Sequence, residues 1–154
     1  MNKFFSWEIS RKLLLAIIED KVSDAFVCEL IWERLCYEKH EKSKSWIATL
    51  KTPKYWSDKY VEAPQIVAER SAAVHLTRSI SKEYKQSLKE FMNFKGYKIN
   101  ELYPRRTRRA AAVNWLISYV RESNLIIPEN GKLPELKNPP INPAVGHTGD
   151  LPII

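Results

Sequence analysis

Apolar side chains recur at helical spacing in four stretches of the chain, and each stretch follows a residue that suits the start of a helix. Ser6 precedes the first stretch, Ser23 or Asp24 the second, Ser81 the third and Pro104 the fourth. Ser and Asp side chains accept hydrogen bonds from the first free N–H groups of a helix, and Pro fits its first turn. The pattern therefore predicts helices over about residues 7–19, 24–38, 82–93 and 105–121.

The intervals between these helices lack the helical period. Residues 39–63 form a polar loop followed by closely spaced rings and prolines, which indicates an irregular segment that its rings hold against the core. An exposed aromatic docking surface is the alternative, with Trp46, Tyr55, Trp56 and Tyr60 as its candidate residues. After Pro64 we expect a short helix to about Arg70, and the weak alternation over residues 73–77 indicates a short strand or an extended linker.

The composition changes again near the end of the chain. Residues 122–154 hold six of the nine prolines and three of the four glycines, and such a segment does not build regular elements. The sequence thus predicts an all-α fold, a compact bundle of about four to five helices with an irregular aromatic-rich segment and a Pro-rich C-terminal tail. We expect the helical domain over residues 4–127 and an extended or mobile tail over residues 128–154.

Composition narrows the class of protein. The 154 residues suffice for one domain, and 44% apolar with 28% charged residues is typical of a globular protein. No apolar run approaches the roughly 18 residues of a membrane span, and the N-terminus lacks the apolar stretch of an export signal. Cys28 and Cys36 share one predicted helix, where their spacing of eight residues puts them roughly 12 Å apart, too far for a disulfide. These features predict a soluble cytoplasmic protein with free thiols.

The net charge of +7 is concentrated in one part of the chain. Residues 75–121 contain eleven Lys or Arg against three Glu, so their net charge is +8, whereas the rest of the chain sums to −1. Such clustering is how an electrostatic binding surface shows in a sequence, and a solvated basic face that aids solubility is the alternative. The centre of this segment is the run Pro104-Arg105-Arg106-Thr107-Arg108-Arg109.

Four arginines stand where the last predicted helix begins. A helix N-terminus already carries partial positive charge, so cations there destabilise the helix unless an anion shares the site. Placed on a helix, Arg106 and Arg109 fall on the same side as the apolar stripe, which puts their guanidinium groups at the rim of the core. The run therefore predicts an anion site. Its candidate residues are Arg105, Arg106, Arg108 and Arg109, with flanking charge from Lys95 and Lys98.

Three kinds of anion suit such a site. The first is a nucleic-acid backbone, RNA or DNA, held through phosphate contacts. The second is a set of acidic side chains, either of a partner protein or of the chain's own predicted helix 24–38, which carries Asp24, Glu29, Glu33 and Glu38. The third is a small phosphorylated ligand, which the lack of a Gly-rich phosphate loop disfavours. We favour the nucleic acid, with a protein–protein adaptor or assembly factor as the alternative.

Catalytic chemistry finds little support in the sequence. His40, His75 and His147 have no neighbouring ligand or nucleophile pattern. No G-x-S-x-G, H-E-x-x-H or C-x-x-C motif occurs. The sequence therefore indicates binding rather than catalysis, with no catalytic residue, no metal site and no cofactor.

The stretch from Phe94 to Arg109, followed by Asn114-Trp115-Leu116, resembles a small family of uncharacterised proteins from cyanobacteria and plastids. Residues 5–9 (Phe-Ser-Trp-Glu-Ile) and 76–80 (Leu-Thr-Arg-Ser-Ile) are similar to the same family. The resemblance covers about residues 4–122 and leaves the tail out. The family has no assigned activity, so the resemblance implies no catalytic residues. It implies a cyanobacterial cytoplasm or plastid stroma, where an assembly factor for photosynthetic complexes is one form of the adaptor alternative.

Overall fold

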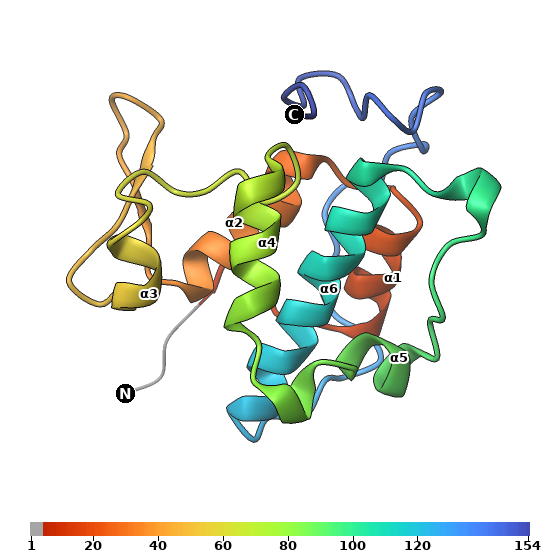
Figure 1. The fold of residues 1–154 in the computed structure, drawn as a ribbon, viewed down its shortest axis with the longest axis horizontal. Helices are drawn as coiled ribbons and strands as arrows, with labels where there is room; N and C mark the ends of the chain where they lie inside the picture. Colours follow the sequence, from red (N-terminus) through yellow and green to blue (C-terminus); the bar gives the residue numbers. More distant parts are fainter. Residues whose placement is uncertain (1–4) are drawn as a thin grey trace.

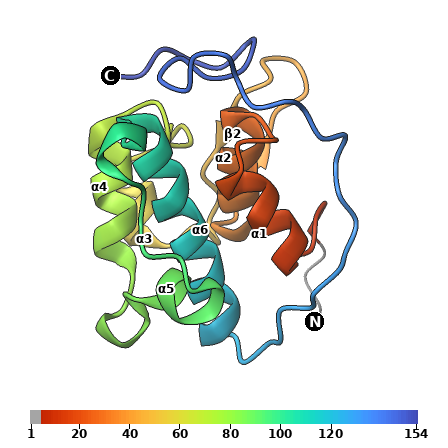
Figure 2. The same ribbon diagram turned by 90° about the vertical axis from the view of Figure 1, so that its right-hand side faces the viewer.

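The computed structural model describes residues 5–154 and shows a helical bundle built around one central helix, α6 (Pro104–Glu122) (Figure 1). Helices α1 and α4 lie on opposite sides of α6 in both ribbon views (Figure 2). The all-α prediction is confirmed. The helices that pack against α6 are α1 (Arg11–Ile18), α2 (Asp24–Arg34), α4 (Arg70–Ser79) and α5 (Ser87–Met92).

The apolar core fills the space between these helices. Leu116 and Ile117 of α6 are fully buried, as are Leu13 of α1, Ile31 of α2 and Leu76 of α4. Burying one such aliphatic side chain stabilises a fold by about 1.5–3 kcal/mol. The bundle therefore depends mainly on this shared apolar contact with α6.

Both α1 and α2 begin at serine N-caps, and one of these caps differs from the prediction. Ser23 caps α2 as expected, whereas α1 begins behind Ser10. The expectation of a helix from residue 7 behind Ser6 was wrong, because the Ser6 hydroxyl donates to the Glu33 carboxylate at 2.6 Å instead. Helix α2 ends earlier than expected, since Cys36 adopts a φ of +66° and turns the chain.

The aromatic-rich segment contains a short hairpin and one helical turn. Strand β1 (Glu38–Lys39) pairs antiparallel with β2 (Trp46–Ile47), and α3 (Lys54–Ser57) follows. The Trp46 ring lies 5.6 Å from the Trp32 ring of α2, and the buried Trp56 ring lies 4.7 Å from the His75 ring of α4. These ring contacts attach the segment to α2 and α4.

Helix α4 is where the structure departs most from the sequence prediction. Residues 73–77, expected as a strand or linker, lie within this helix, and a turn over residues 66–68 replaces the short helix expected before it. Ala72, Ala73 and Leu76 face the core at helical spacing. Small alanine side chains give a weak periodic signal, and this is why the alternation of the larger residues misled the assignment.

The chain between α4 and α6 is divided into short pieces. The predicted helix 82–93 consists of a 3-10 turn, η1 (Lys82–Tyr84), and of α5, which ends at Asn93 in the left-handed conformation with a φ of +53°. A second 3-10 turn, η2 (Ile99–Glu101), precedes α6. Pro104 takes the first position of α6, as the sequence predicted.

The Pro-rich tail has no helix or strand, runs around the outside of the bundle (Figure 2) and is hydrogen-bonded to the domain at separate points. Main-chain hydrogen bonds join Pro128 to α1, Lys137 to the turn between α1 and α2, and Ile154 to the turn before α4. Within residues 5–154, none of the helices is long and apolar enough to cross a membrane.

Replacing Leu76 by alanine tests the helical assignment of α4. Leu76 is fully buried against the core, so Leu76→Ala should lower the free energy of unfolding by about 2–5 kcal/mol. Urea denaturation followed by tryptophan fluorescence measures this change. The control Ser71→Ala, at an exposed position of the same helix, should change it by less than about 0.5 kcal/mol. Equal effects of the two substitutions would contradict this packing.

Candidate functional site

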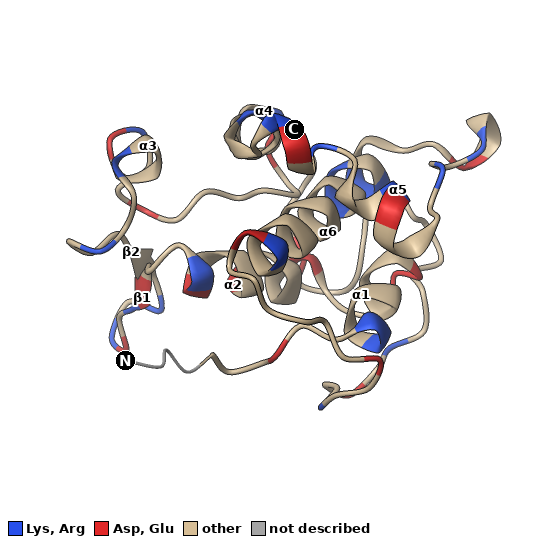
Figure 3. Ribbon diagram, turned by 90° about the horizontal axis from the view of Figure 1, so that it is seen from below, with Lys and Arg blue, Asp and Glu red and all other residues tan. Residues whose placement is uncertain are grey.

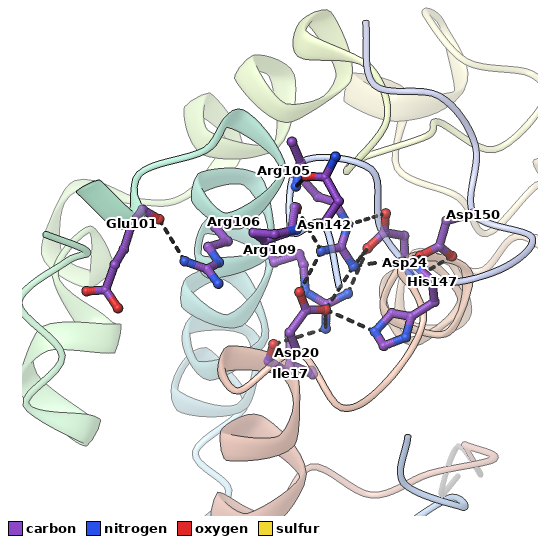
Figure 4. A network of polar contacts seen from close by, with 12 residues as sticks. Ile17, Asp20, Asp24, Glu101, Arg105, Arg106, Arg109, Asn142, His147 and Asp150 are labelled. Carbon is purple, nitrogen blue, oxygen red and sulfur yellow. Dashed lines mark hydrogen bonds and ion pairs between the residues drawn. The ribbon is translucent and has the colours of Figure 1, made fainter. Parts of the chain in front are cut away.

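Two arginines of the run point into the bundle. Arg105 and Arg109 stand one turn apart on α6, and their side chains are 0% and 1% exposed. Figure 3 shows the arginine run as a blue stretch of α6 between the other helices. Both side chains face the junction between α1 and α2, where Asp20 and Asp24 lie (Figure 4).

Each of the two guanidinium groups contacts both carboxylates. Arg105 donates from Nη1 to Asp20 Oδ2 at 2.6 Å and from Nε to Asp24 Oδ2 at 2.9 Å. Arg109 donates from Nη1 to Asp24 Oδ1 at 2.8 Å, and its Nη2 lies 3.5 Å from Asp20 Oδ1. Two positive and two negative charges therefore compensate each other inside the protein, as burial requires.

The connection between α1 and α2 aims these carboxylates at α6. Asp20 follows the end of α1 with a φ of +61°, the left-handed conformation that Asp tolerates better than most residues. Asp24 is the first residue of α2, directly after the Ser23 cap. Arg109 Nη2 also donates to the Ile17 carbonyl oxygen in the last turn of α1 at 3.0 Å. The cluster thus ties together the end of α1, the start of α2 and the start of α6.

The tail closes this group of charges from the outside. His147 Nε2 lies 3.0 Å from Asp20 Oδ1. The Asp150 carboxylate accepts the N–H groups of Asp24 and His147 at 3.0 and 2.8 Å, and its Oδ2 lies 3.7 Å from Arg105 Nη2. All these side chains are buried. We call the six residues the buried ionic cluster: Asp20, Asp24, Arg105, Arg109, His147 and Asp150.

Burial and neighbouring charges shift two acids of the cluster in opposite directions. Burial raises the pKa of Asp20, but the hydrogen bond from Arg105 and the positive charge of Arg109 outweigh it, so the pKa lies below its ordinary value of 3.8. Burial and the negative charge of Asp24 hold the pKa of Asp150 above its ordinary value. Asp20 therefore ionises more readily than a free aspartate, and Asp150 ionises less readily.

Arg106 points away from the buried ionic cluster (Figure 4). Its guanidinium carbon lies 5.7 Å and 5.2 Å from the ring centroids of Tyr97 and Tyr103, within reach of cation–π attraction. Lys95 and Lys98 are exposed in the preceding loop. The structure thus divides the candidate anion site, since it leaves these three residues at the surface and pairs Arg105 and Arg109 internally.

Arg108 belongs to a groove between α4 and α6 with a volume of about 620 Å³. Arg70 and Arg78 of α4 line the same groove, and no Asp or Glu side chain within residues 5–154 forms an ion pair with any of the three. Burial and the charge of Arg70 lower the pKa of Arg108. The rest of the lining is mostly apolar and includes Ala73, Val74, Leu102, Pro104 and Ala111. We call this region the arginine groove.

Three of the four candidate docking aromatics gather around His75 of α4, whereas Trp46 packs against Trp32 of α2. Tyr55 stacks on the His75 ring at 3.9 Å, and Trp56 and Tyr60 present their edges to it at 4.7 and 5.5 Å. Trp56 is buried, Trp46 and Tyr60 are half-buried, and Tyr55 is 44% exposed. Most of this aromatic surface is therefore turned toward the protein itself.

Sequence reasoning missed three members of the buried ionic cluster. Asp20 lies in the short link between the first two predicted helices, where no site residue was expected, and His147 and Asp150 lie in the predicted tail. One signal was available for the tail, because Gly146 and Gly149 enclose His147 and indicate a tight turn. Of the acids on the predicted helix 24–38, the sequence could not single out Asp24 as the one that meets the arginines.

The described part of the chain has no metal-binding cluster, and the Cys28 thiol is deeply buried. Within residues 5–154, no group of three or more His, Cys, Asp and Glu side chains is arranged to hold a metal ion. Burial raises the pKa of the Cys28 thiol to about 12, so this thiol stays protonated and unreactive.

Comparison with known proteins places the chain among proteins without an assigned activity. The model of a family described as a domain of unknown function, DUF1823, matches residues 8–121. A protein structure solved by solution NMR is 43% identical to the chain, with a TM-score of 0.65, and the match covers 80% of this chain and 99% of that one. None of the curated proteins matches the chain. The match to the family ends before the tail begins.

The substitution Asp20→Asn tests the charge balance of the buried ionic cluster. Asp20→Asn keeps the shape but removes the carboxylate that accepts two hydrogen bonds from the buried Arg105 guanidinium group, so it should lower the free energy of unfolding at neutral pH by about 3–5 kcal/mol. A carboxylate with a lowered folded-state pKa stabilises the fold above its unfolded-state pKa, and this stabilisation is lost as pH falls through the folded-state value. The difference between wild type and variant should therefore shrink below pH 3.8, the ordinary value for Asp20.

Urea titrations between neutral pH and strongly acidic pH measure this difference. Asp58→Asn, at an exposed position after α3, controls for the loss of one negative charge. A difference for Asp20→Asn that stays constant with pH, or that equals the control, would contradict the assigned pairing.

Proposed function

The chain belongs to the DUF1823 family, and from that premise we propose that it is a non-catalytic binding module whose arginine groove takes an acidic segment of a partner protein. The observation that carries this proposal is the meeting of three arginines, none paired with an Asp or Glu side chain within residues 5–154, in a groove whose remaining lining is mostly apolar. Arg105 and Arg109 do not take part, because their charges are used internally.

The charge of the groove favours an anion. Arg70, Arg78 and Arg108 carry like charges along one depression, and the lowered pKa of Arg108 reflects its burial and its repulsion by Arg70. Arg108 Nη1 is held by the main-chain oxygens of Val67 and Ala68 at 3.1 and 3.0 Å. Its guanidinium group is therefore positioned before any ligand arrives, which reduces the entropy lost on binding.

The floor of the groove favours a protein segment over a nucleic-acid backbone. Leu102 is 55% exposed and lines the groove together with Val74 and Ala111. A phosphate backbone would leave this apolar surface uncovered, whereas an amphipathic segment can bury leucine-like side chains there and present carboxylates to the rim. Charge and apolar surface together thus fit an acidic, amphipathic peptide.

A nucleic acid remains the second candidate function, at a neighbouring surface. Arg106 lies over Tyr97 and Tyr103, and the exposed Lys95 and Lys98 precede it in the chain. Rings combined with cations suit single-stranded nucleic acid, since bases stack on aromatic side chains and phosphates attract Lys and Arg. This surface does not include the arginines of the groove.

Fluorescence anisotropy with two labelled probes distinguishes the candidates. One probe is a helical peptide with Glu and Leu along one face, and the other is single-stranded poly(U) RNA. The groove predicts that Arg78→Ala weakens peptide binding on the order of tenfold, because one rim charge is lost, and that Arg106→Ala leaves it unchanged. If nucleic acid is the ligand, Arg106→Ala should weaken RNA binding and flatten its salt dependence.

Lys12→Ala serves as the matched control, since it removes one exposed charge from α1 on the other side of α6. Equal losses for Lys12→Ala and Arg78→Ala would indicate attraction by net charge alone and contradict a specific groove. Absence of peptide binding at low salt would contradict the proposal as well.

A further inference from the structure

The last part of the tail is bound to the domain like a peptide ligand. Residues 142–154 contain no helix or strand, and they contact the domain at two places, the buried ionic cluster and the edge of the arginine groove. In Figure 2 the chain before these residues runs along the outside of the bundle, and the dark blue C-terminal stretch crosses its end. At each place, specific hydrogen bonds hold the tail, as they hold a peptide ligand in its binding site.

The first contact is a carboxylate site that Asp150 fills. Its Oδ1 accepts the N–H of Asp24 at 3.0 Å, in the first turn of α2, and its Oδ2 lies 3.7 Å from Arg105 Nη2. The Asp150 side chain is 1% exposed. A helix N-terminus and a guanidinium group thus converge on one buried anion. Arg105 Nη1 also donates to the Pro143 carbonyl oxygen at 3.3 Å, which fixes the chain entering the turn.

The turn that carries this carboxylate requires glycine. Gly146 has a φ of +93°, and a Cβ atom there would lie 2.8 Å from Arg105 Nε and 2.9 Å from Asp150 Oδ2. Both distances are too short for any side chain. The main chain of the tail therefore lies directly against the guanidinium group, as a peptide does in a fitted site.

The second contact lies at the edge of the arginine groove. Ile154 donates its N–H to the Ala68 carbonyl at 2.7 Å, and its own main-chain oxygen accepts the Arg70 N–H at 3.1 Å. The same oxygen accepts from Arg108 Nη1 at 3.0 Å. The tail thus occupies hydrogen-bond donors of two residues that line the groove.

The charge balance indicates that the tail is the separable part of the cluster. The domain alone supplies Arg105 and Arg109 against Asp20 and Asp24, which is a balanced set. Asp150 brings a third carboxylate, and burial and Asp24 raise its pKa. The arginines outweigh the desolvation of Asp20 but not that of Asp150, so docking the tail buries a carboxylate whose desolvation is less fully compensated. The family match, residues 8–121, likewise contains the balanced set without the tail.

We propose that the junction of α1, α2 and α6 is a recognition site for a peptide turn in which glycine is followed by a carboxylate. Residues 142–154 occupy this site within the chain, and a partner segment of the same chemistry replaces them. Displacing the tail removes Ile154 from Arg70 and Arg108 and so opens the edge of the arginine groove. This last step rests on the proposed function of the groove, whereas the peptide site itself does not.

Two substitutions in the full chain test this proposal by releasing the tail from its site, and a separate peptide with the sequence of the tail then replaces it. Gly146→Ala prevents the turn from lying against Arg105, and Asp150→Asn removes the carboxylate without adding an atom near it. Both variants should raise the rate of limited proteolysis in residues 128–145 by at least about tenfold, because an undocked segment is open to the protease. Val145→Ala, at a 61% exposed position, should leave this rate unchanged.

A labelled peptide of residues 141–154 should then bind both variants at concentrations below about 1 mM and should bind wild type at least tenfold more weakly, since its own tail competes. The same peptide carrying Asp150→Asn should bind neither. The proposal is overturned if the tryptophan fluorescence or the melting cooperativity of both variants is lost, because the tail is then part of the fold. It is also overturned if the peptide fails to bind either folded variant.

The outcomes separate this site from the groove. Binding of the tail peptide without binding of the Glu- and Leu-containing probe would leave the turn site intact and contradict the groove. The converse result would contradict the turn site and leave the groove.

Discussion

The structure depends on placing two guanidinium groups inside a helical bundle. Arg105 and Arg109 are as buried as the core leucines, and such charges are tolerated only where carboxylates and carbonyl oxygens satisfy them. Asp20 and Asp24 supply the charge. The helix ends also gain, because Arg109 binds a carbonyl in the last turn of α1 and Asp150 accepts an N–H in the first turn of α2. The arginines at the start of α6 thus stabilise the ends of its neighbours.

This arrangement changes the functional meaning of the arginine run. The four arginines divide between two environments, since positions 105 and 109 face inward while positions 106 and 108 remain at the surface. The inward pair organises the fold and the docking of the tail. The outward pair belongs to two separate surfaces, the arginine groove for Arg108 and the tyrosine-flanked surface for Arg106. Because carboxylates compensate the two arginines of the buried ionic cluster, the net positive charge of the protein comes from residues outside the cluster.

Much of the fold followed from local signals, and the site did not. The Ser23 cap and Pro104 located the starts of α2 and α6, because both act within one turn of their helix. Helix α4 was missed, since its buried face is largely alanine and carries little hydrophobic contrast. The pairing of Arg105 with Asp20 joins residues 85 positions apart, and Asp20 occupies a left-handed position that no periodicity marks. The sequence predicted an anion near the arginines, but only tertiary packing determined that the chain supplies it.

The most direct measurement of the central claim is a double-mutant cycle between Arg105 and Asp20. Urea unfolding of wild type, Arg105→Gln, Asp20→Asn and the double variant gives the coupling free energy of the pair. Contact at 2.6 Å between buried side chains predicts a coupling of at least about 1.5 kcal/mol, because each single variant leaves one buried charge without this partner and the double variant removes both charges. A coupling near zero would mean that the two side chains do not meet, and it would contradict the account of the arginine run as the internal anchor of the bundle.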